Sequence, residues 1–327
     1  MTVLVAAYSD VAAWCIPEPY VERLRREFPG HTFVRADSDA ETKACIGGAE
    51  VALGARIRRD HLAAARRLRW IHSPAAGVGN MLFPEMVASA VIITNSRGNS
   101  SVTIGEHVIA VTLALLRRLP LAFRRQQERV WGQEEFDAGP PVATLRGARM
   151  LIVGLGSIGG EVAVLAAAFG ATVIGVRRTT AGPRHPSVTA VVTPDRLHAE
   201  LPLADVVLLA APHTAGTWHL IGARELALMK KGAVMVNVGR GSLVDEAALE
   251  GALEAGALRG AALDVFEREP LPHDSPLWNR PDVLITPHVS GFHPRHWDGV
   301  VGIFADNLRR FAAGEALMNV VNKEAGY

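Results

Sequence analysis

The chain has 327 residues, of which 49% are hydrophobic and 20% are charged, and its 34 basic residues nearly balance 33 acidic ones. This composition excludes a disordered chain, and the formal net charge of +1 gives no electrostatic reason for binding nucleic acid or an anionic membrane. The length is sufficient for two domains of ordinary size.

The cysteines and the apolar stretches indicate in which compartment the protein works and whether it binds metal or membrane. Cys15 and Cys45 are too few for a disulfide framework, and no Cys/His cluster has the spacing of a metal site. The N-terminal residues lack the basic start of a signal peptide, and the longest uncharged apolar stretch, 206–223, contains a proline and two histidines. We therefore expect a cytoplasmic protein that holds no metal and does not span a membrane.

The first hundred residues alternate short apolar runs with helix-like segments. Residues 2–8 form the first apolar run, and 20–30 follow as an amphipathic helix that Pro29 and Gly30 end. Four more apolar runs continue the alternation, at 31–36, 51–55, 68–74 and 91–96. Alternating strands and helices indicate an α/β layer around a mostly parallel sheet.

A long helical pattern over 100–119 comes next, with a serine at its start and arginines in its last turn, as the helix dipole favours. It is placed to link two domains. From 148 to 288 strand and helix patterns alternate more regularly, which predicts a second doubly wound unit. The tail begins as a helix at 296 and ends in a short apolar run, and we expect it to pack on the first domain.

A glycine-rich turn lies between a predicted strand and a predicted helix. Gly154, Gly156 and Gly159 match the G-x-G-x-x-G pattern of a dinucleotide site. The first glycine permits a tight turn, the second lets the backbone approach a pyrophosphate, and the third lets the helix pack near the strand. The phosphates would then bind the N–H groups at the start of the helix, which includes Ser157 and Ile158.

The next strand ends where a ribose should lie, and there the chain has Arg177, Arg178 and Thr179. An NAD-type site carries an acidic residue here that binds a ribose hydroxyl. A 2′-phosphate would be repelled by a carboxylate and held by guanidinium groups. The residues favour NADP(H), with NAD(H) as a weaker ligand, and the structural alternative is a pair of solvated charges.

Three later strand ends carry charged or titratable residues: Arg240, Asp264 with Glu269, and His288. Reduction of a 2-oxo acid needs a proton donor, a carboxylate that orients it, and a cation that polarises the carbonyl. His288, Glu269 and Arg240 supply these groups, and ligands gather at such strand ends in open α/β sheets. Each residue also has an ordinary structural interpretation, as a turn histidine, a loop acid or half of a surface ion pair.

The ordered motifs GLGSIG, APHTAGT, VNVGRGSLVDEAAL, GAALDVFEREPLP, SPLW and TPHVSG resemble the D-isomer-specific 2-hydroxyacid dehydrogenase family over nearly the whole chain. The resemblance implies an α/β fold with two doubly wound parallel-sheet domains, one flavodoxin-like for substrate and one Rossmann domain for cofactor, with a cleft between them. We expect 1–98 plus 292–327 to form the substrate domain and 99–291 the dinucleotide-binding domain. The resemblance also implies a homodimer.

The resemblance further implies a role for each matching residue. Arg240 would bind the substrate carboxylate and carbonyl, His288 would be the acid/base, and Glu269 would pair with it. Backbone amides around Ala76 and Gly77 would hold the substrate carboxylate. The expected cofactor contacts are Gly154, Gly156, Ser157, Ile158, Gly159, Arg177, Arg178, Thr179, Ala211, Pro212, Asp264 and Gly291.

Together these features predict an NADP(H)-preferring reductase that converts small 2-oxo acids, such as glyoxylate, hydroxypyruvate or bulkier 2-oxo acids, into D-2-hydroxy acids. Two alternatives stay open. One is an NAD-dependent dehydrogenase that works in the oxidising direction, and the other is a non-catalytic, nucleotide-sensing protein like a corepressor of this family. The expected partners are 2-oxo or 2-hydroxy acids, not nucleic acid or membrane. Because no long segment follows the tail, we expect no separate regulatory domain.

Overall fold

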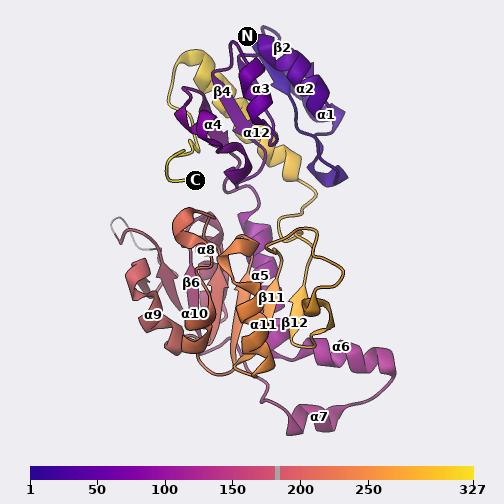
Figure 1. Ribbon diagram of the computed structural model, residues 1–327, viewed down its shortest axis with the longest axis vertical. Coiled ribbons are helices and arrows are strands. Elements are labelled where there is room, and N and C mark those ends of the chain that lie inside the picture. The colour runs from indigo at the N-terminus through magenta and orange to yellow at the C-terminus, as the bar shows by residue number, and fades with distance from the viewer. Residues whose placement is uncertain (181–184) are drawn as a thin grey trace. The chain divides into compact units, whose positions relative to one another are not determined.

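The computed structural model describes residues 1–180 and 185–327, which form two compact units (Figure 1). Unit 1 contains Met1–Ser100 and Phe292–Tyr327, and unit 2 contains Ser101–Gly291. The chain therefore leaves unit 1, builds the whole of unit 2 and then returns. Each unit is built around its own parallel sheet, which confirms the predicted α/β class with two doubly wound sheets.

The sheet of unit 1 has five strands in the order β2-β1-β3-β4-β5, and every neighbouring pair is parallel. Successive side chains of a strand point to opposite faces, so Val3 and Val5 enter one core cluster and Leu4 enters another. This explains why the strands read as continuous apolar runs. They are β1 (Thr2–Val5), β2 (Thr32–Arg35), β3 (Val51–Leu53), β4 (Trp70–Ser73) and β5 (Ile92–Asn95).

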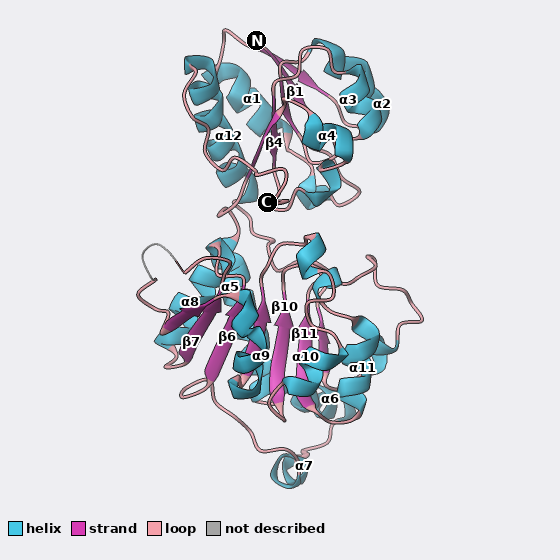
Figure 2. Cartoon of the chain, turned by 60° about the vertical axis from the view of Figure 1, so that its left-hand side comes forward, coloured by secondary structure: helices cyan, strands magenta, loops and turns pink. Residues whose placement is uncertain are grey.

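Helices cover both faces of this sheet, as Figure 2 shows. α1 (Glu18–Glu27) and α12 (His296–Ala313) pack on one face, where Phe304 of α12 is fully buried. The other face is covered by α2 (Asp39–Cys45), α3 (Arg59–Ala64) and α4 (Pro84–Ala88). The C-terminal segment thus supplies part of the core of unit 1.

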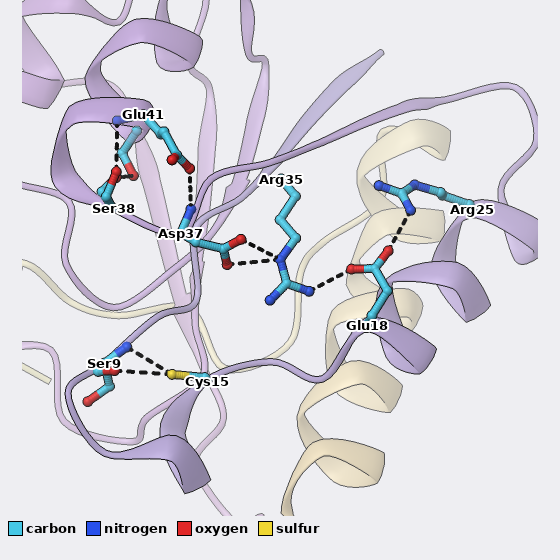
Figure 3. Close-up of polar contacts among 9 residues, drawn as sticks. Ser9, Cys15, Glu18, Arg25, Arg35, Asp37, Ser38 and Glu41 are labelled. Carbon is cyan, nitrogen blue, oxygen red and sulfur yellow. Dashed lines mark hydrogen bonds and ion pairs between the residues drawn. The ribbon is translucent and has the colours of Figure 1, made fainter.

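Polar side chains link α1 and α2 of unit 1 to the end of β2 (Figure 3). Arg35 donates to Glu18 (2.7 Å) and to Asp37 (2.8 Å), and Glu18 also accepts from Arg25 (2.8 Å). Ser38 caps α2 by accepting from the Glu41 N–H at 3.2 Å. Exposed ion pairs of this kind contribute at most about 1 kcal/mol each, so they orient these elements more than they stabilise them.

The sheet of unit 2 has seven parallel strands in the order β12-β11-β10-β9-β6-β7-β8. The order reverses between β6 and β9, which is the switch point where open α/β sheets bind ligands. The strands are β6 (Arg149–Val153), β7 (Thr172–Val176), β8 (Ala190–Val192), β9 (Val206–Leu209), β10 (Ala233–Asn237), β11 (Leu258–Leu263) and β12 (Val283–Ile285).

Alternating strand residues again feed two core clusters, one on each face. α5 (Ser101–Leu116) and α8 (Ser157–Ala168) pack on one face. α10 (Ala223–Leu228) and α11 (Glu246–Glu254) pack on the other, beside α9 (Leu197–Glu200). The remaining helices, α6 (Leu119–Glu128) and α7 (Gln133–Ala138), have no buried residue.

The long helix predicted over 100–119 ends earlier than its pattern indicates. α5 stops at Leu116, and Arg118 adopts a left-handed backbone with φ +57°. A new helix then begins at Leu119, with Pro120 in its first turn. Proline lacks an N–H and clashes with the preceding turn inside a helix, so it is accommodated at a helix start and not in a continuous helix.

Cys15 and Cys45 are free thiols, and Cys15 Sγ contacts the backbone of Ser9, accepting from its N–H at 3.3 Å (Figure 3). Within residues 1–180 and 185–327, no group of three His, Cys, Asp or Glu side chains is arranged to hold a metal ion. The helices in that same part of the chain are all too short or too polar to cross a membrane.

Candidate active site

The candidate residues of unit 2 follow the ends of adjacent strands. The glycine turn follows β6, Arg177 follows β7 and Ala211 follows β9. Arg240, Asp264 and His288 follow β10, β11 and β12 in the same way. Because these strands are parallel and neighbouring, their carboxyl ends lie along one edge of the sheet.

The glycine turn packs directly against the end of β9. Gly154 has φ +103°, and a Cβ at this position would lie 2.5 Å from the backbone nitrogen of Ala211. A Cβ at Gly159 would lie 2.3 Å from the carbonyl oxygen of Gly154. Any larger residue would therefore separate β6, α8 and the segment after β9. Gly156 differs, because a Cβ there meets no atom within 4 Å.

The open space at Gly156 fits the pyrophosphate of a dinucleotide. Gly156 is the N-cap of the 12-residue helix α8. The first N–H groups of a helix, here including those of Ser157 and Ile158, have no partner within the helix. They and the helix dipole attract an anion. An NAD(P) cofactor needs space for its pyrophosphate close to the backbone and N–H groups that are free to bind it. The turn at Gly156 offers both, so these residues fit the cofactor.

The end of β7 places two arginines beside this turn. The Arg177 N–H donates to the Val192 carbonyl (3.1 Å), and its Nη2 donates to the Thr180 carbonyl (3.4 Å). Arg178 and Thr179 are exposed. No acidic residue occurs from 177 to 180, so this strand end offers cations and hydroxyls to a ligand but no carboxylate.

The other expected cofactor residues occupy the same sheet edge. Ala211 is nearly buried against Gly154. The Pro212 carbonyl accepts from the Thr217 hydroxyl at 2.8 Å, which fixes the turn after β9. Gly291 is the last residue of unit 2.

His288 and Glu269 form a hydrogen-bonded pair. His288 Nδ1 lies 2.7 Å from Glu269 Oε2, and the other carboxylate oxygen accepts from the Phe266 N–H at 3.0 Å. The His288 side chain is 49% exposed. Among the described residues its Nε2 has no hydrogen-bond partner. A histidine held in this way presents Nε2 for proton exchange with a ligand.

The backbone of His288 is left-handed, with φ +54°. Its N–H donates to the carbonyls of Asp264 (2.9 Å) and Thr286 (3.0 Å). The buried Asp264 carboxylate accepts from the Thr286 hydroxyl at 2.6 Å. It also accepts from the N–H groups of Val289 (3.0 Å) and Ser290 (3.1 Å). Asp264 therefore holds the loop that carries His288.

Arg240 lies in a turn that packs against the loop carrying Glu269. A Cβ at Gly241 would lie 1.8 Å from the Phe266 carbonyl carbon, so only glycine allows this approach. Asn237 fixes the turn, because its Nδ2 donates to the Arg240 carbonyl at 2.9 Å and its Oδ1 accepts from the Gly239 N–H at 3.1 Å. The Arg240 guanidinium donates to the Gly239 carbonyl at 2.6 Å.

The charges of this group support one another. Burial by itself raises the pKa of the Glu269 carboxyl. The hydrogen bond and charge of His288, the Phe266 N–H and the charge of Arg240 outweigh burial, so the pKa lies below its usual value. Burial lowers the pKa of the Arg240 guanidinium, and the Glu269 carboxylate opposes that shift. Glu269 is therefore an anion at neutral pH, placed to accept a hydrogen bond from His288 Nδ1.

Ala76 and Gly77 lie in unit 1, in the loop after β4. Ala76 is exposed, and its carbonyl accepts from Asn95 Nδ2 at 2.6 Å. The N–H groups of Ala76 and Gly77 donate to none of the described residues. Successive N–H groups without internal acceptors can bind an anion.

Several residues that shape these sites were not anticipated from the sequence. Asn237 and Thr286 orient Arg240 and His288, and Asn95 holds the loop of Ala76. His107 lies 3.3 Å from the Thr286 hydroxyl, and burial lowers its pKa against the opposing charge of Asp264. The available signal was a polar residue at the end of an apolar strand run, as for Asn237 and Asn95, but this signal does not say which partner the side chain meets.

Comparison with known proteins gives a consistent result. Residues 109–290 match the family described as "D-isomer specific 2-hydroxyacid dehydrogenase, NAD binding domain". The chain is 34% identical over 273 residues to the D-3-phosphoglycerate dehydrogenase of Methanocaldococcus jannaschii, a match that covers 82% of this chain and 50% of that protein. The chain thus spans about half the length of this relative.

Two further proteins match over most of their own length. The chain is 32% identical over 274 residues to the glyoxylate reductase of Thermococcus litoralis, covering 82% of this chain and 81% of that one. A crystal structure of an NADPH-dependent glyoxylate/hydroxypyruvate reductase from Sinorhizobium meliloti, in complex with NADP and sulfate, has a TM-score of 0.85 and 26% identity. That match covers 100% of this chain and 99% of that one. The chain therefore belongs to the D-isomer-specific 2-hydroxyacid dehydrogenase family.

Proposed function

We propose that this protein reduces small 2-oxo acids to D-2-hydroxy acids and prefers NADP(H) as its cofactor. The main support is the hydrogen-bonded pair of His288 and Glu269, 2.7 Å apart. The pair lies at the edge of the sheet where Arg240 and the glycine turn also lie. A proton donor, its orienting carboxylate and a cation are the groups that reduction of a carbonyl needs.

His288 is assigned as the acid/base. With Nδ1 bonded to Glu269, the proton that the substrate oxygen receives comes from Nε2. The Glu269 carboxylate stabilises the imidazolium before transfer and orients the neutral ring afterwards. In the oxidising direction the same nitrogen takes the proton from the hydroxyl group.

Arg240 is assigned to the substrate carboxylate and carbonyl oxygen. Its partial burial strengthens the attraction, because charges interact more strongly away from water. A guanidinium also matches the geometry of a carboxylate. The N–H groups of Ala76 and Gly77 are assigned to the substrate carboxylate as further donors.

The cofactor is assigned to the glycine turn and the end of β7. Gly156, Ser157, Ile158 and the start of α8 would hold its pyrophosphate, and Arg177, Arg178 and Thr179 would hold a 2′-phosphate. When bound, a reduced nicotinamide supplies the hydride. The NADP in the Sinorhizobium meliloti structure supports this preference.

We propose in addition that the protein is a homodimer. Support comes from Phe123, Val130 and Trp131 in and after α6, whose side chains are 58%, 48% and 89% exposed. Apolar side chains gathered along one segment of a surface often mark an interaction site. Sedimentation equilibrium measures the mass directly, and a monomer at micromolar concentration would contradict this part of the proposal.

The test is steady-state kcat/KM for glyoxylate, hydroxypyruvate and phenylpyruvate, each with NADPH and with NADH. We expect turnover of at least one acid and a higher kcat/KM with NADPH. Equal or better use of NADH would leave the reductase and overturn the cofactor assignment. Cofactor binding without turnover of any acid would favour a nucleotide-sensing role.

A further inference from the structure

Two hydrogen-bond donors inside unit 1 hold the loop of Ala75, Ala76 and Gly77. The Ser96 N–H donates to the Ala75 carbonyl at 3.4 Å. The side-chain amide of Asn95 donates to the Ala76 carbonyl at 2.6 Å. Both donors lie at the buried end of β5, so both carbonyls point into unit 1.

The orientation of these two carbonyls sets the orientation of two N–H groups. The peptide bonds of the loop are trans. In a trans peptide the C=O of one residue and the N–H of the next point in opposite directions. Because the carbonyls of Ala75 and Ala76 point inward, the N–H groups of Ala76 and Gly77 point outward. These are the two groups assigned above to the substrate carboxylate.

Asn95 is itself fixed by its neighbours. Its Oδ1 accepts from the Arg97 N–H at 3.3 Å. The Asn319 side chain donates to the carbonyls of Asn95 (3.1 Å) and Arg97 (3.0 Å), and the Asn95 N–H donates to the Asn319 carbonyl at 3.2 Å. The C-terminal segment thus holds the backbone of Asn95, and the Arg97 N–H holds Oδ1 of its side chain, which leaves Nδ2 toward the loop.

A buried polar network lies directly below. His72, which is fully buried, bonds to the hydroxyls of Thr94 (2.7 Å) and Ser96 (3.1 Å). The Ser96 hydroxyl donates to the Ser73 carbonyl, also at 3.1 Å. Partnered groups in a low-dielectric interior resist rearrangement, since each lost bond leaves a buried polar group unpaired. The end of β5 is therefore a rigid support for the loop.

We propose that Asn95 is a positioning residue for substrate binding: its amide aims the N–H groups of Ala76 and Gly77 outward by holding the Ala76 carbonyl. This inference rests on the proposed function for the identity of the anion, a 2-oxo acid. It assigns to Asn95 an effect on substrate affinity and none on cofactor affinity or proton transfer.

The experiment compares three variants at pH 8. Asn95→Asp keeps the shape and the Oδ1 acceptor but replaces the donor by an oxygen that repels the Ala76 carbonyl. Asn95→Ala removes the side chain. Trp70→Phe is the matched control, because the Trp70 Nε1 donates to the Thr94 hydroxyl (2.8 Å) in the same buried network without reaching the loop.

We expect both Asn95 variants to raise the KM for the best 2-oxo acid at least tenfold, with kcat and the KM for NADPH changed less than threefold. Trp70→Phe should lower the unfolding midpoint and leave all three constants within threefold. An unchanged substrate KM in folded Asn95→Asp would overturn the inference, as would an equal rise in Trp70→Phe.

A second readout separates this inference from the proposed function. Oxamate, an unreactive analogue of a 2-oxo acid, is titrated while the amide resonances of Ala76 and Gly77 are followed by NMR. We expect shifts in the wild type that Asn95→Asp loses at the same oxamate concentration. Wild-type protein that turns over no 2-oxo acid would overturn the proposed function, while these shifts would still decide the role of Asn95. No shift in the wild type would overturn the inference.

Discussion

His288 combines a left-handed backbone, a carboxylate partner and an exposed ring. A non-glycine residue in this conformation costs on the order of 1 kcal/mol or more, and it persists only where surrounding bonds enforce it. Here the bonds come from Asp264 and Thr286 to the His288 backbone. These hydrogen bonds therefore offset the backbone strain at His288 and hold its imidazole in one orientation, which supports its assignment as the acid/base.

Removing this imidazole tests the assignment. We expect His288→Ala to lower kcat about 10²–10⁴-fold, the usual contribution of a positioned acid/base, with NADPH affinity unchanged within threefold. His198→Ala is the matched control, since His198 is also a histidine paired with a glutamate, 2.8 Å from Glu225, but lies in α9. Near-normal kcat in His288→Ala would show that another group supplies the proton.

Arg177 is the residue assigned to select NADP(H) over NAD(H). We expect Arg177→Asp to lower the ratio of kcat/KM for NADPH to that for NADH at least tenfold, because a carboxylate repels a 2′-phosphate and accepts from a ribose hydroxyl. Arg124→Asp, at an exposed position of α6, controls for the change in net charge. If both variants keep the wild-type ratio, Arg177 does not select the cofactor.

The buried His72 makes the stability of unit 1 depend on pH. Burial lowers its pKa to about 3, whereas the same histidine in the unfolded chain titrates near its ordinary value of 6.5. Below pH 6.5 the unfolded chain therefore binds a proton that the folded unit does not, and stability falls as pH falls. The loss reaches at most about 1.4 kcal/mol per pH unit, between pH 6.5 and the folded pKa.

We expect this histidine to cost the wild type about 2 kcal/mol of unfolding free energy between pH 6.5 and 5. Urea unfolding monitored by tryptophan fluorescence measures it, and His72→Gln should show a shallower dependence on pH. The same slope in both proteins would assign the acid sensitivity to other groups.

At the scale of elements, glycines decide which segments approach one another. Gly154 and Gly159 let β6, α8 and the end of β9 meet. Gly241 lets the turn carrying Arg240 touch the backbone of Phe266, three residues before Glu269. The first contact builds the turn assigned to the cofactor, and the second brings the loops of two assigned catalytic side chains together.

Gly241→Ala should impair catalysis without impairing cofactor binding. Its Cβ would overlap the Phe266 backbone, and overpacking of this kind typically costs about 1–3 kcal/mol. We expect kcat/KM for the 2-oxo acid to fall at least 100-fold, with NADPH affinity within threefold. Gly251→Ala in α11, where a Cβ meets nothing within 4 Å, should be neutral or slightly stabilising. Equal kinetics for both variants would contradict the close approach at Gly241.

At the scale of the whole molecule, unit 1 is discontinuous. Its sheet comes from the first hundred residues, but α12 returns from the end of the chain to cover one face. Phe304 stacks on Trp70 with ring centres 5.2 Å apart, and both are fully buried. The core of unit 1 is therefore complete only after the last helix has been made.

Phe304→Ala should destabilise unit 1 selectively. Loss of a buried phenylalanine costs about 3–5 kcal/mol, whereas Phe169→Ala, at an exposed position of unit 2, should cost less than about 1 kcal/mol. We expect a lower urea midpoint for unit 1 and unchanged NADPH affinity, measured by fluorescence titration. A parallel loss of NADPH binding would mean that the two units do not unfold separately.

Short-range patterns in the sequence were sufficient for the fold class and for a domain that binds NAD(P). Continuous apolar runs alternating with amphipathic segments indicate a parallel sheet with helices, because buried strands have no polar face. The spacing of Gly154, Gly156 and Gly159 carries a mechanism of its own. The ordered motifs further resembled one family, to which the comparisons show that the chain belongs. Local pattern extended α5 too far, since the apolar pattern continues to Leu119 although Pro120 is accommodated only at the start of a new helix.

Only the tertiary structure decided which side chains meet. Asn95 and Ala76 are 19 residues apart, and so are Glu269 and His288, yet each pair is in contact. Such contacts depend on the packing and register of whole strands, which no local window of sequence contains. Likewise, the 2.7 Å pairing that supports the proposed chemistry exists because bonds from Asp264 to Thr286 and to the backbone after it hold the loop of His288 beside that of Glu269. The sequence by itself determined which groups are available, and the fold determined which of them act together.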